Sequence, residues 1–158
     1  MGRKSEISAG LLVYRRTPDV LVLLAHPGGP YWAKKDAGAW TIPKGLVEQT
    51  DGLLATAQRE FTEETGFVAR PPFVPLAPVK QKSGKTVHAF ACAGEFDTDL
   101  FVSNSFEIEW PPRSRRMQSF PEVDRLAWFT LPAAHTKILV YQRPFLRELE
   151  QMLASLGK

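Results

Sequence analysis

The chain has 158 residues, of which 44% are hydrophobic and 23% are charged. That length and composition are typical of one globular domain with a hydrophobic core of its own, so we expect a single domain over residues 1–158. The formal net charge of +3 suits an anionic substrate, but it is too small to indicate the concentrated basic face of a dedicated nucleic-acid-binding protein.

The single cysteine excludes an internal disulfide and a cysteine-based zinc site. Cys92 lies in an apolar run, and we expect it to be a small buried residue. The first ten residues, MGRKSEISAG, lack the apolar core of a signal peptide, and no apolar run approaches the roughly 20 residues that span a bilayer. These features predict a cytoplasmic protein with no membrane partner.

Two short apolar runs, rich in leucine and β-branched residues, begin the chain at residues 7–15 and 19–25. The turn residues Thr17-Pro18-Asp19 separate them, so the pattern predicts a β-hairpin. Residues 27–39 are rich in Gly and Pro and predict a loop, after which a short extended segment, AWTIP, leads to Lys44-Gly45.

Residues 52–65 predict a helix, because its apolar residues recur at spacings of three and four and form one buried stripe: Leu54, Ala57 and Phe61. Thr50 or Asp51 can cap the start of this helix, and Gly66 can end it.

The rest of the chain alternates between strand and helix patterns. We expect strands at 73–80, 86–96 and 122–130, an irregular segment at 106–120, and a C-terminal helix at about 141–155. The order of these elements predicts a mixed α/β domain without fixing its topology.

Three glutamates stand on the predicted helix at positions 60, 63 and 64, which are neighbours on a helical surface. Their mean direction lies about a quarter turn from the apolar stripe, so we expect them in a cleft at the edge of the core. Each like-charge pair costs roughly 0.2–0.5 kcal/mol, and the helix dipole costs roughly 0.3–1 kcal/mol more for each anion near the C-terminus. A bound cation would offset this repulsion; the alternative is a solvated acidic helix end.

The spacing around these glutamates resembles the Nudix box, which reads G-x5-E-x7-R-E-aliphatic-x-E-E-x-G-aliphatic. The 23 positions from 45 to 67 match that spacing, with these residues at the fixed positions: Gly45, Asp51, Arg59, Glu60, Phe61, Glu63, Glu64, Gly66 and Phe67. Asp51 replaces the first glutamate, and phenylalanines stand at both aliphatic positions. In the family the first glutamate pairs with the box arginine, so the resemblance implies a structural Asp51–Arg59 contact.

The resemblance extends beyond the box. Residues 40–45, WTIPKG, resemble the lead-in of diadenosine polyphosphate hydrolases and RNA pyrophosphohydrolases, and residues 121–124, PEVD, followed by Trp128, resemble a late strand of the RNA pyrophosphohydrolases. Residues 5–147 as a whole look like a bacterial, MutT-like subgroup of predicted NTP pyrophosphohydrolases. The resemblance implies the Nudix α/β/α sandwich, with a mixed central sheet and the box helix packed on it.

Clustered carboxylates without a nearby His or Cys favour a hard cation, either Mg²⁺ or Mn²⁺. The resemblance implies that the carbonyl of Gly45 assists the three carboxylates that would ligate it: Glu60, Glu63 and Glu64. It also implies one further carboxylate from the late strand, as a ligand or as the base, which we assign to Glu122. Glu107 and Glu109 are its rivals.

Several cations outside the helix are candidates for binding the substrate. Lys44 directly precedes Gly45, and we expect it to touch phosphate. Two loops combine cations with aromatic residues and could flank a polyphosphate, one through Lys34 and Lys35 and the other through Arg115 and Arg116; solvation is the alternative for both. We expect one of four aromatic residues to stack on a base: Tyr31, Trp32, Trp40 or Trp110.

These features predict a divalent-metal-dependent hydrolase that cleaves a diphosphate linkage in a small phosphorylated substrate, such as a dinucleoside polyphosphate or an NTP. RNA 5′ ends and inositol pyrophosphates stay open but are not favoured. Two other classes remain: a non-catalytic nucleotide- or RNA-binding module on a Nudix scaffold, and a basic adaptor domain whose acidic helix is incidental. The sequence does not indicate an oligomeric state.

Overall fold

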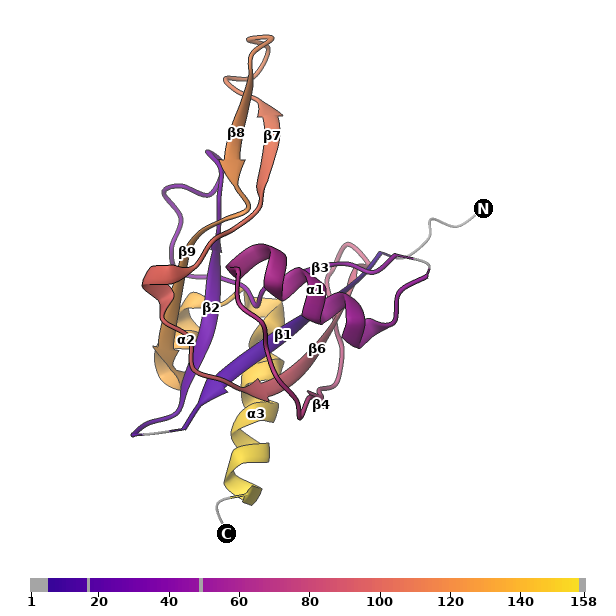
Figure 1. Ribbon diagram of the computed structural model, residues 1–158, viewed down its shortest axis with the longest axis vertical. Helices are drawn as coiled ribbons and strands as arrows, with labels where there is room; N and C mark the ends of the chain where they lie inside the picture. The colour runs from indigo at the N-terminus through magenta and orange to yellow at the C-terminus, as the bar shows by residue number, and fades with distance from the viewer. Residues whose placement is uncertain (1–5, 17, 49, 157–158) are drawn as a thin grey trace.

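The computed structural model describes residues 6–16, 18–48 and 50–156. Its first two strands form the expected hairpin (Figure 1). β1 (Ile7–Arg15) and β2 (Leu21–Pro27) pair antiparallel, with Tyr14 opposite Val22 and Arg15 opposite Leu21. Thr17, which we placed in the turn, lies outside the described residues.

The hairpin forms the centre of a mixed sheet with the strand order β4-β6-β1-β2-β9. β6 (Thr86–Ala93) runs parallel to β1, and β9 (Val123–Thr130) runs antiparallel to β2. Three short strands pair at the margins, β3 on β1 and the other two on β6: β3 (Lys44–Leu46), β4 (Val74–Pro75) and β5 (Val79–Lys80).

The two faces of this sheet carry separate hydrophobic clusters, because neighbouring residues of a strand point to opposite faces. Leu11 of β1 packs with Phe61 of α1 (Leu53–Thr65), whereas its neighbour Leu12 packs with Phe145 of α3 (Arg143–Leu156). α2 (Leu131–Lys137) contributes to the α3 side, and Figure 1 shows α1 in front of the sheet and α3 behind it. The predicted α/β/α sandwich with a mixed sheet is confirmed. None of the helices within the described ranges is long and apolar enough to cross a membrane.

Some predicted boundaries are wrong. The expected strand at 73–80 is divided into β4 and β5, because Pro75 and Pro78 cannot donate backbone hydrogen bonds. The C-terminal helix begins at Arg143, after a 3-10 turn over Val140–Gln142. A second 3-10 turn, over Thr98–Leu100, was not expected. Nor was α2, where the Thr130 hydroxyl accepts the Ala133 N–H at 3.3 Å.

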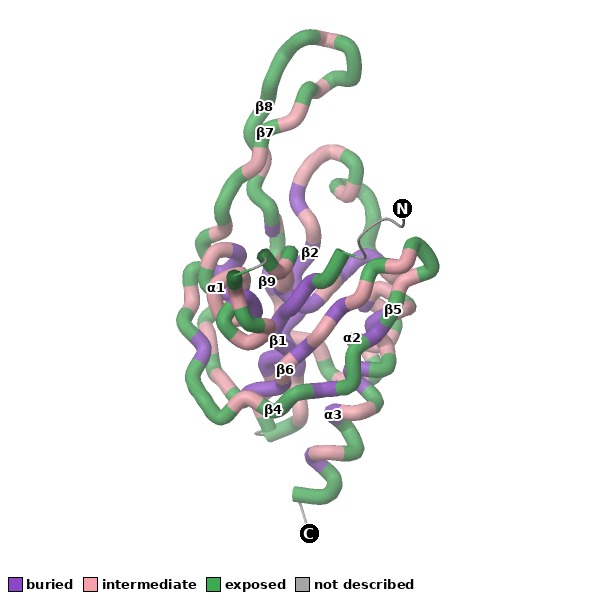
Figure 2. The backbone as a smooth tube through the Cα atoms, turned by 90° about the vertical axis from the view of Figure 1, so that its right-hand side faces the viewer, coloured by how far each residue is buried: buried purple, intermediate pink, exposed green. Residues whose placement is uncertain are grey.

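The largest difference concerns residues 106–120, which are not irregular. β7 (Ser105–Glu109) and β8 (Met117–Pro121) form a separate two-stranded antiparallel sheet with Phe106 opposite Phe120. We refer to residues 105–121 as the arm. It stands out from the body of the molecule (Figure 1), and most of its residues are exposed (Figure 2).

Candidate active site

The helix that carries the three glutamates is positioned by its apolar stripe. Ala57 and Phe61 are fully buried against the sheet, and the half-buried Leu53 packs beside them. The predicted stripe was therefore wrong at its first position, because Leu54 is half-buried but does not belong to this cluster. Gly66 ends the helix with a left-handed φ of 79°, and its N–H donates to the Thr62 carbonyl. The start was predicted wrongly, because the N-cap is Gly52 and no side chain caps the helix.

Gly45 lies directly against Glu60. A Cβ at position 45 would overlap the carboxylate at the end of the Glu60 side chain, so glycine lets this carboxylate lie directly against the backbone of β3. Burial raises the pKa of Glu60, and the charge of Glu63 raises it further, while Arg59 opposes the shift. The close approach therefore holds a carboxylate where its negative charge is poorly solvated.

Glu64 is the most confined of the three glutamates. It is 7% exposed, and its Oε2 is buried without a hydrogen-bond partner. Burial, followed by the charges of Glu60 and Glu122, raises its pKa well above the ordinary value, and Lys44 opposes this shift. An unpartnered buried oxygen of this kind costs about 1–3 kcal/mol, more when charged, so the site favours a cation beside it.

The expected pairing of loop and helix is present in the structure. Asp51 Oδ2 lies 3.3 Å from Arg59 Nη1, and Arg59 Nη2 lies 3.6 Å from Glu60 Oε1. The shorter aspartate side chain therefore still reaches the arginine. Because both partners are more than 30% exposed, the pair orients Arg59 rather than stabilising the fold strongly.

Glu122 reaches the same site from the other end of the chain, at the junction of the arm and β9. Its N–H donates to the Asn104 carbonyl at 2.7 Å, and the Asn104 N–H donates to the Glu63 carbonyl at 2.9 Å. The last turn of α1 thus holds Glu122 through Asn104, which also satisfies a helix-end carbonyl. Burial and the charge of Glu63 raise the pKa of Glu122.

Glu64 and Glu122 form part of the wall of a cavity of about 390 Å³. The other walls come from the end of β2, from the loop after it and from one face of β7, and they are mainly apolar: Pro27, Gly28, Gly29, Tyr31, Trp32, Phe106 and Ile108. We refer to this cavity as the aromatic pocket. An apolar pocket with a few charged groups on one wall is the usual form of a small-molecule site.

Phe106 and Ile108 had no part in the sequence prediction of the site. The alternation of apolar and acidic residues in FEIEW indicates a strand, but the following prolines and arginines suggested a loop. Strand geometry directs the rivals of Glu122 away from this cavity, because Glu107 and Glu109 point to the opposite face of β7 from Phe106 and Ile108. Glu109 instead accepts the Arg113 N–H at 2.8 Å.

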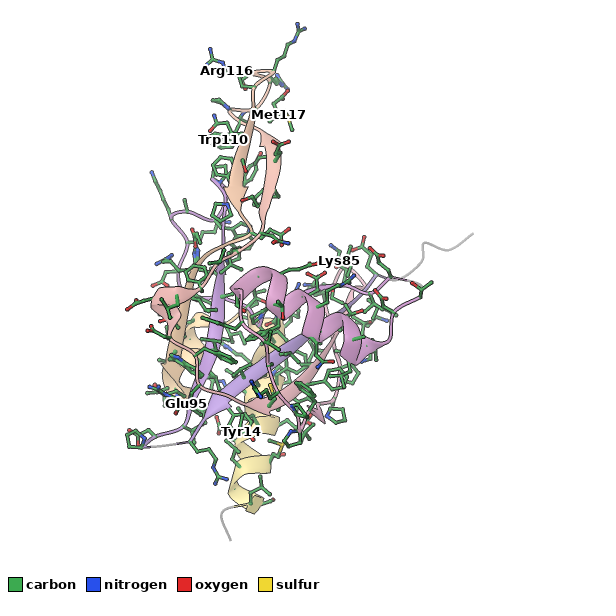
Figure 3. All side chains as sticks on the ribbon, viewed as in Figure 1. Tyr14, Lys85, Glu95, Trp110, Arg116 and Met117 are labelled. Carbon is green, nitrogen blue, oxygen red and sulfur yellow. The ribbon has the colours of Figure 1, made fainter. Side chains whose placement is uncertain are left out.

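The candidate cations differ in how near they lie to the carboxylates. Lys44 is close enough for its charge to act on Glu64. The Lys35 ammonium lies 5.0 Å from the ring centre of Trp32 at the pocket, while Lys34 is exposed in the same loop. Arg115 and Arg116 lie at the far end of the arm, away from the carboxylates, and Arg116 is labelled there in Figure 3.

The four aromatic candidates also differ in whether they lie at the aromatic pocket. Trp40 is 4% exposed and packs edge-on against Phe129, so the structure excludes it as a base platform. Tyr31 and Trp32 line the aromatic pocket, and Trp110 contacts Tyr31 with ring centres 5.2 Å apart.

His26 fixes the loop that carries Tyr31 and Trp32. This histidine is fully buried, its Nε2 lies 2.6 Å from the Lys35 carbonyl, and its Nδ1 lies 2.7 Å from Asp124 Oδ1. Local sequence patterns did not predict this role, because Asp124 is 98 residues away from His26 in the chain.

The donor set at this site fits a hard divalent cation, since it consists of carboxylate and carbonyl oxygens. The unpartnered Oε2 of Glu64 and the raised pKa values of Glu60 and Glu122 are the observations that favour one. Among the residues that the structure describes, no three His, Cys, Asp or Glu side chains are grouped closely enough to hold a metal ion. The carboxylates therefore share a cleft without converging on one point.

Comparison with known proteins gives a consistent result. A family model described as the NUDIX domain matches residues 4–149. An Ap4A hydrolase from C. elegans, solved as a binary complex, has a similar structure with a TM-score of 0.65 and 22% identity, covering 94% of this chain and 98% of that one. The NUDIX domain of Shewanella oneidensis NrtR, in complex with ADP ribose, has a TM-score of 0.64 and 17% identity, covering 98% of this chain and 90% of that one. A MutT protein from Methanosarcina mazei has a TM-score of 0.61 and 19% identity, covering 96% of this chain and 98% of that one. At these identities the likeness to solved structures concerns the fold.

Proposed function

Because the chain belongs to the NUDIX family of pyrophosphohydrolases, we propose that it cleaves a diphosphate linkage in a nucleotide-type substrate and depends on Mg²⁺ or Mn²⁺. The observation that carries this proposal is the buried Glu64 carboxylate, which has an unpartnered oxygen and forms part of the wall of the aromatic pocket. The unpartnered oxygen of this carboxylate would bind a cation, and the carboxylate would lie next to a substrate held in the pocket.

The residues at this site would have three roles. Glu60, Glu63 and Glu64, with the Gly45 carbonyl, would hold the cation, and Asp51–Arg59 would keep the loop against the helix. When bound, the cation would offset the negative charge of the diphosphate and lower the pKa of an attacking water. Lys44 would neutralise charge on the phosphate oxygens.

Glu122 is the residue we assign as a further ligand or as the general base. Its raised pKa brings the carboxylate nearer to neutral pH, which improves proton abstraction. The hydrogen bonds through Asn104 hold it beside the last turn of α1 and would keep it in position during turnover.

The aromatic pocket would receive the nucleoside part of the substrate, with Trp32 or Tyr31 stacked on the base. Lys35, over the Trp32 ring, would sit at the edge of the pocket. Dinucleoside polyphosphates and NTPs fit this arrangement, since both join a base to a chain of phosphates.

The test is an assay of the purified protein with Mg²⁺ or Mn²⁺ against diadenosine polyphosphates, NTPs, ADP-ribose, 5′-triphosphorylated RNA and inositol pyrophosphates. Products would be separated by chromatography, beside the double variant Glu63→Gln/Glu64→Gln. We expect metal-dependent cleavage of one class and a loss of about a thousandfold or more in the variant. No turnover with either metal would contradict the proposal and favour a non-catalytic nucleotide-binding module.

A further inference from the structure

The arm is much larger than the pocket wall requires. Phe106 and Ile108 of β7 line the pocket, but β7 continues to Glu109, and Trp110 and a loop with three arginines follow. At about 3.4 Å per residue, Phe106 and Trp110 are separated by roughly 14 Å along the strand. Figure 3 shows Trp110, Arg116 and Met117 on the outer part of the arm, far from α1.

One face of the arm carries an apolar and aromatic track. Phe106 and Ile108 alternate with the two glutamates of β7, so they lie on the face that meets the pocket. Trp110 is the first residue after β7, and its contact with Tyr31 of the pocket wall places it on the same side. Tyr31, which is 62% exposed, packs edge-on against Trp110. It extends the track from the aromatic pocket towards the tip of the arm, by which we mean residues 111–116 between the two strands. The track therefore begins at Glu64 and Glu122 and leads outward.

Positive charge gathers at the outer end of this track. Arg113, Arg115 and Arg116 are all exposed, and no acidic residue lies between Trp110 and Pro121. Glu107 and Glu109 are on the opposite face, and Glu109 is engaged by the backbone N–H of Arg113. The tip thus presents three solvated guanidinium groups, with aromatic faces between them and the carboxylates.

We propose that the arm binds single-stranded nucleic acid, with its phosphates against the three arginines and one or two bases on the Tyr31–Trp110 part of the track. Single-strand-binding proteins combine the same two features, a positive path for the backbone and aromatic side chains for the bases. A mononucleotide held in the aromatic pocket does not extend to the tip, whereas an oligonucleotide does.

The choice of nucleic acid over an acidic protein rests on the proposed function. A polymer of nucleotides matches the pocket, the track and the arginines together, whereas an acidic peptide matches only the arginines. Binding by the arm does not require hydrolysis, however, so it can be measured without metal. Failure of this proposal and failure of the hydrolase proposal are therefore distinguishable.

The experiment measures the affinity of the whole chain for 3′-labelled oligonucleotides of about 12 nucleotides with a 5′-hydroxyl, in EDTA, by fluorescence anisotropy. RNA and DNA of the same sequence are compared. Each neutralised phosphate contributes about 0.7 to the slope of log Kd against the logarithm of the salt concentration. Three such phosphates predict a Kd that rises about 20-fold between roughly 50 and 200 mM salt. The triple variant Arg113→Ala/Arg115→Ala/Arg116→Ala should lose about 10-fold or more in affinity at the lower salt, together with most of this salt dependence.

A matched triple variant removes the same charge elsewhere. Arg70, Lys80 and Lys82 are exposed, and they lie in or next to the short strands that pair with β6, whereas the arm leads into β9 at the opposite edge of the sheet. The variant Arg70→Ala/Lys80→Ala/Lys82→Ala should keep the wild-type salt dependence. Tyr31→Ala should weaken binding by about fivefold or more while leaving the salt dependence intact, because it removes stacking and no charge. Unchanged thermal unfolding midpoints would show that all these variants are folded.

Three results would overturn the proposal. The arm variant could bind the oligonucleotides as tightly as the wild type, or the matched variant could lose as much affinity as the arm variant. The wild type could also bind poly-glutamate as tightly as RNA or DNA, with the same dependence on the three arginines. That last result would assign the arm to an acidic protein partner instead.

Discussion

α1 and the arm meet at Asn104 and Glu122, yet they are built in opposite ways. α1 buries a stripe of apolar side chains against a sheet of seven strands, and Ala57 and Phe61 are fully buried there. The arm is a sheet of two strands with most of its residues in solvent. A ribbon of this kind is marginally stable by itself, so it depends on its attachment to the body.

The molecule thus assigns two tasks to two differently built regions. Buried carboxylates with raised pKa values need a rigid support, because the fold must hold like charges together against their repulsion. Exposed arginines need no such support, since solvent already stabilises them. Substitutions should therefore affect stability strongly in α1 and weakly in the arm.

The first prediction concerns Phe61, which is fully buried and lies with its ring centre 5.6 Å from that of Phe96. Phe61→Ala should lower the free energy of unfolding by about 3–5 kcal/mol, because it leaves a cavity between helix and sheet. Phe120→Ala, in the half-buried Phe106–Phe120 pair of the arm, should cost less than half as much. Urea unfolding measures both, and equal losses would contradict the contrast.

The second prediction concerns Gly45. Gly45→Ala should lower the free energy of unfolding by about 1–3 kcal/mol and also reduce activity, because the new methyl group would displace the Glu60 carboxylate. Gly52→Ala is the matched control, since a Cβ there meets nothing within 4 Å and its φ is −73°. It should change stability by less than about 0.5 kcal/mol. An active, fully stable Gly45→Ala variant would show that the close approach is dispensable.

These two regions also differ in how well the sequence predicted them. The box helix, its buried stripe and its end at Gly66 follow from residues close together in the chain, so local periodicity was enough. The arm was missed because Pro111, Pro112 and the arginines are typical of a loop and follow directly after the alternating pattern of β7. The two strands are stabilised by pairing with each other, which local periodicity does not predict. The aromatic pocket was predicted only in part. Tyr31 and Trp32 were candidates for binding a base, but Phe106 and Ile108 were missed because they come from a segment far away in the sequence.

The third prediction follows from the titration of Glu64. Burial first, and then the charges of Glu60 and Glu122, raise the pKa of Glu64 in the folded protein. The protonated acid is thus the form that the fold favours, so its stabilisation is complete below the ordinary pKa of 4.5 and is lost as the pH rises through the folded-state pKa. As the pH rises through this range, the free energy of unfolding of the metal-free protein should fall by about 1–3 kcal/mol relative to that of Glu64→Gln.

Urea unfolding in EDTA between about pH 4 and pH 8 measures this loss. Mg²⁺ added at the upper end should stabilise the wild type more than it stabilises Glu64→Gln. Glu63→Gln, on a side chain that is only half-buried, should retain the pH dependence of the wild type. Parallel curves for the wild type and Glu64→Gln would show that the buried carboxylate does not govern stability.

The fourth prediction concerns the ion pair between Asp51 and Arg59. Asp51→Asn should lower the free energy of unfolding by about 0.5–1 kcal/mol, because the pair is partly exposed and screened by water. Asp51→Glu restores the residue usual at this position of the box and should retain wild-type stability. A loss in Asp51→Asn as large as that in Gly45→Ala would mean that the loop, rather than β3, holds the carboxylates.

The smallest effect is expected at the tip of the arm, where the direction of the change is informative. Arg115 has a φ of 61°, in the left-handed region that non-glycine residues avoid at about 1 kcal/mol, while Arg116 is not among the residues with positive φ in the described chain. Arg115→Gly relieves this strain but gives the unfolded chain more freedom, so it should raise the free energy of unfolding by about 0.5 kcal/mol or less. Arg116→Gly should lower it, because only the second effect applies. A tip that becomes more stable when Arg115 is removed retains that arginine for a reason other than stability, whereas a clear loss in Arg115→Gly would make its side chain part of the support of the arm.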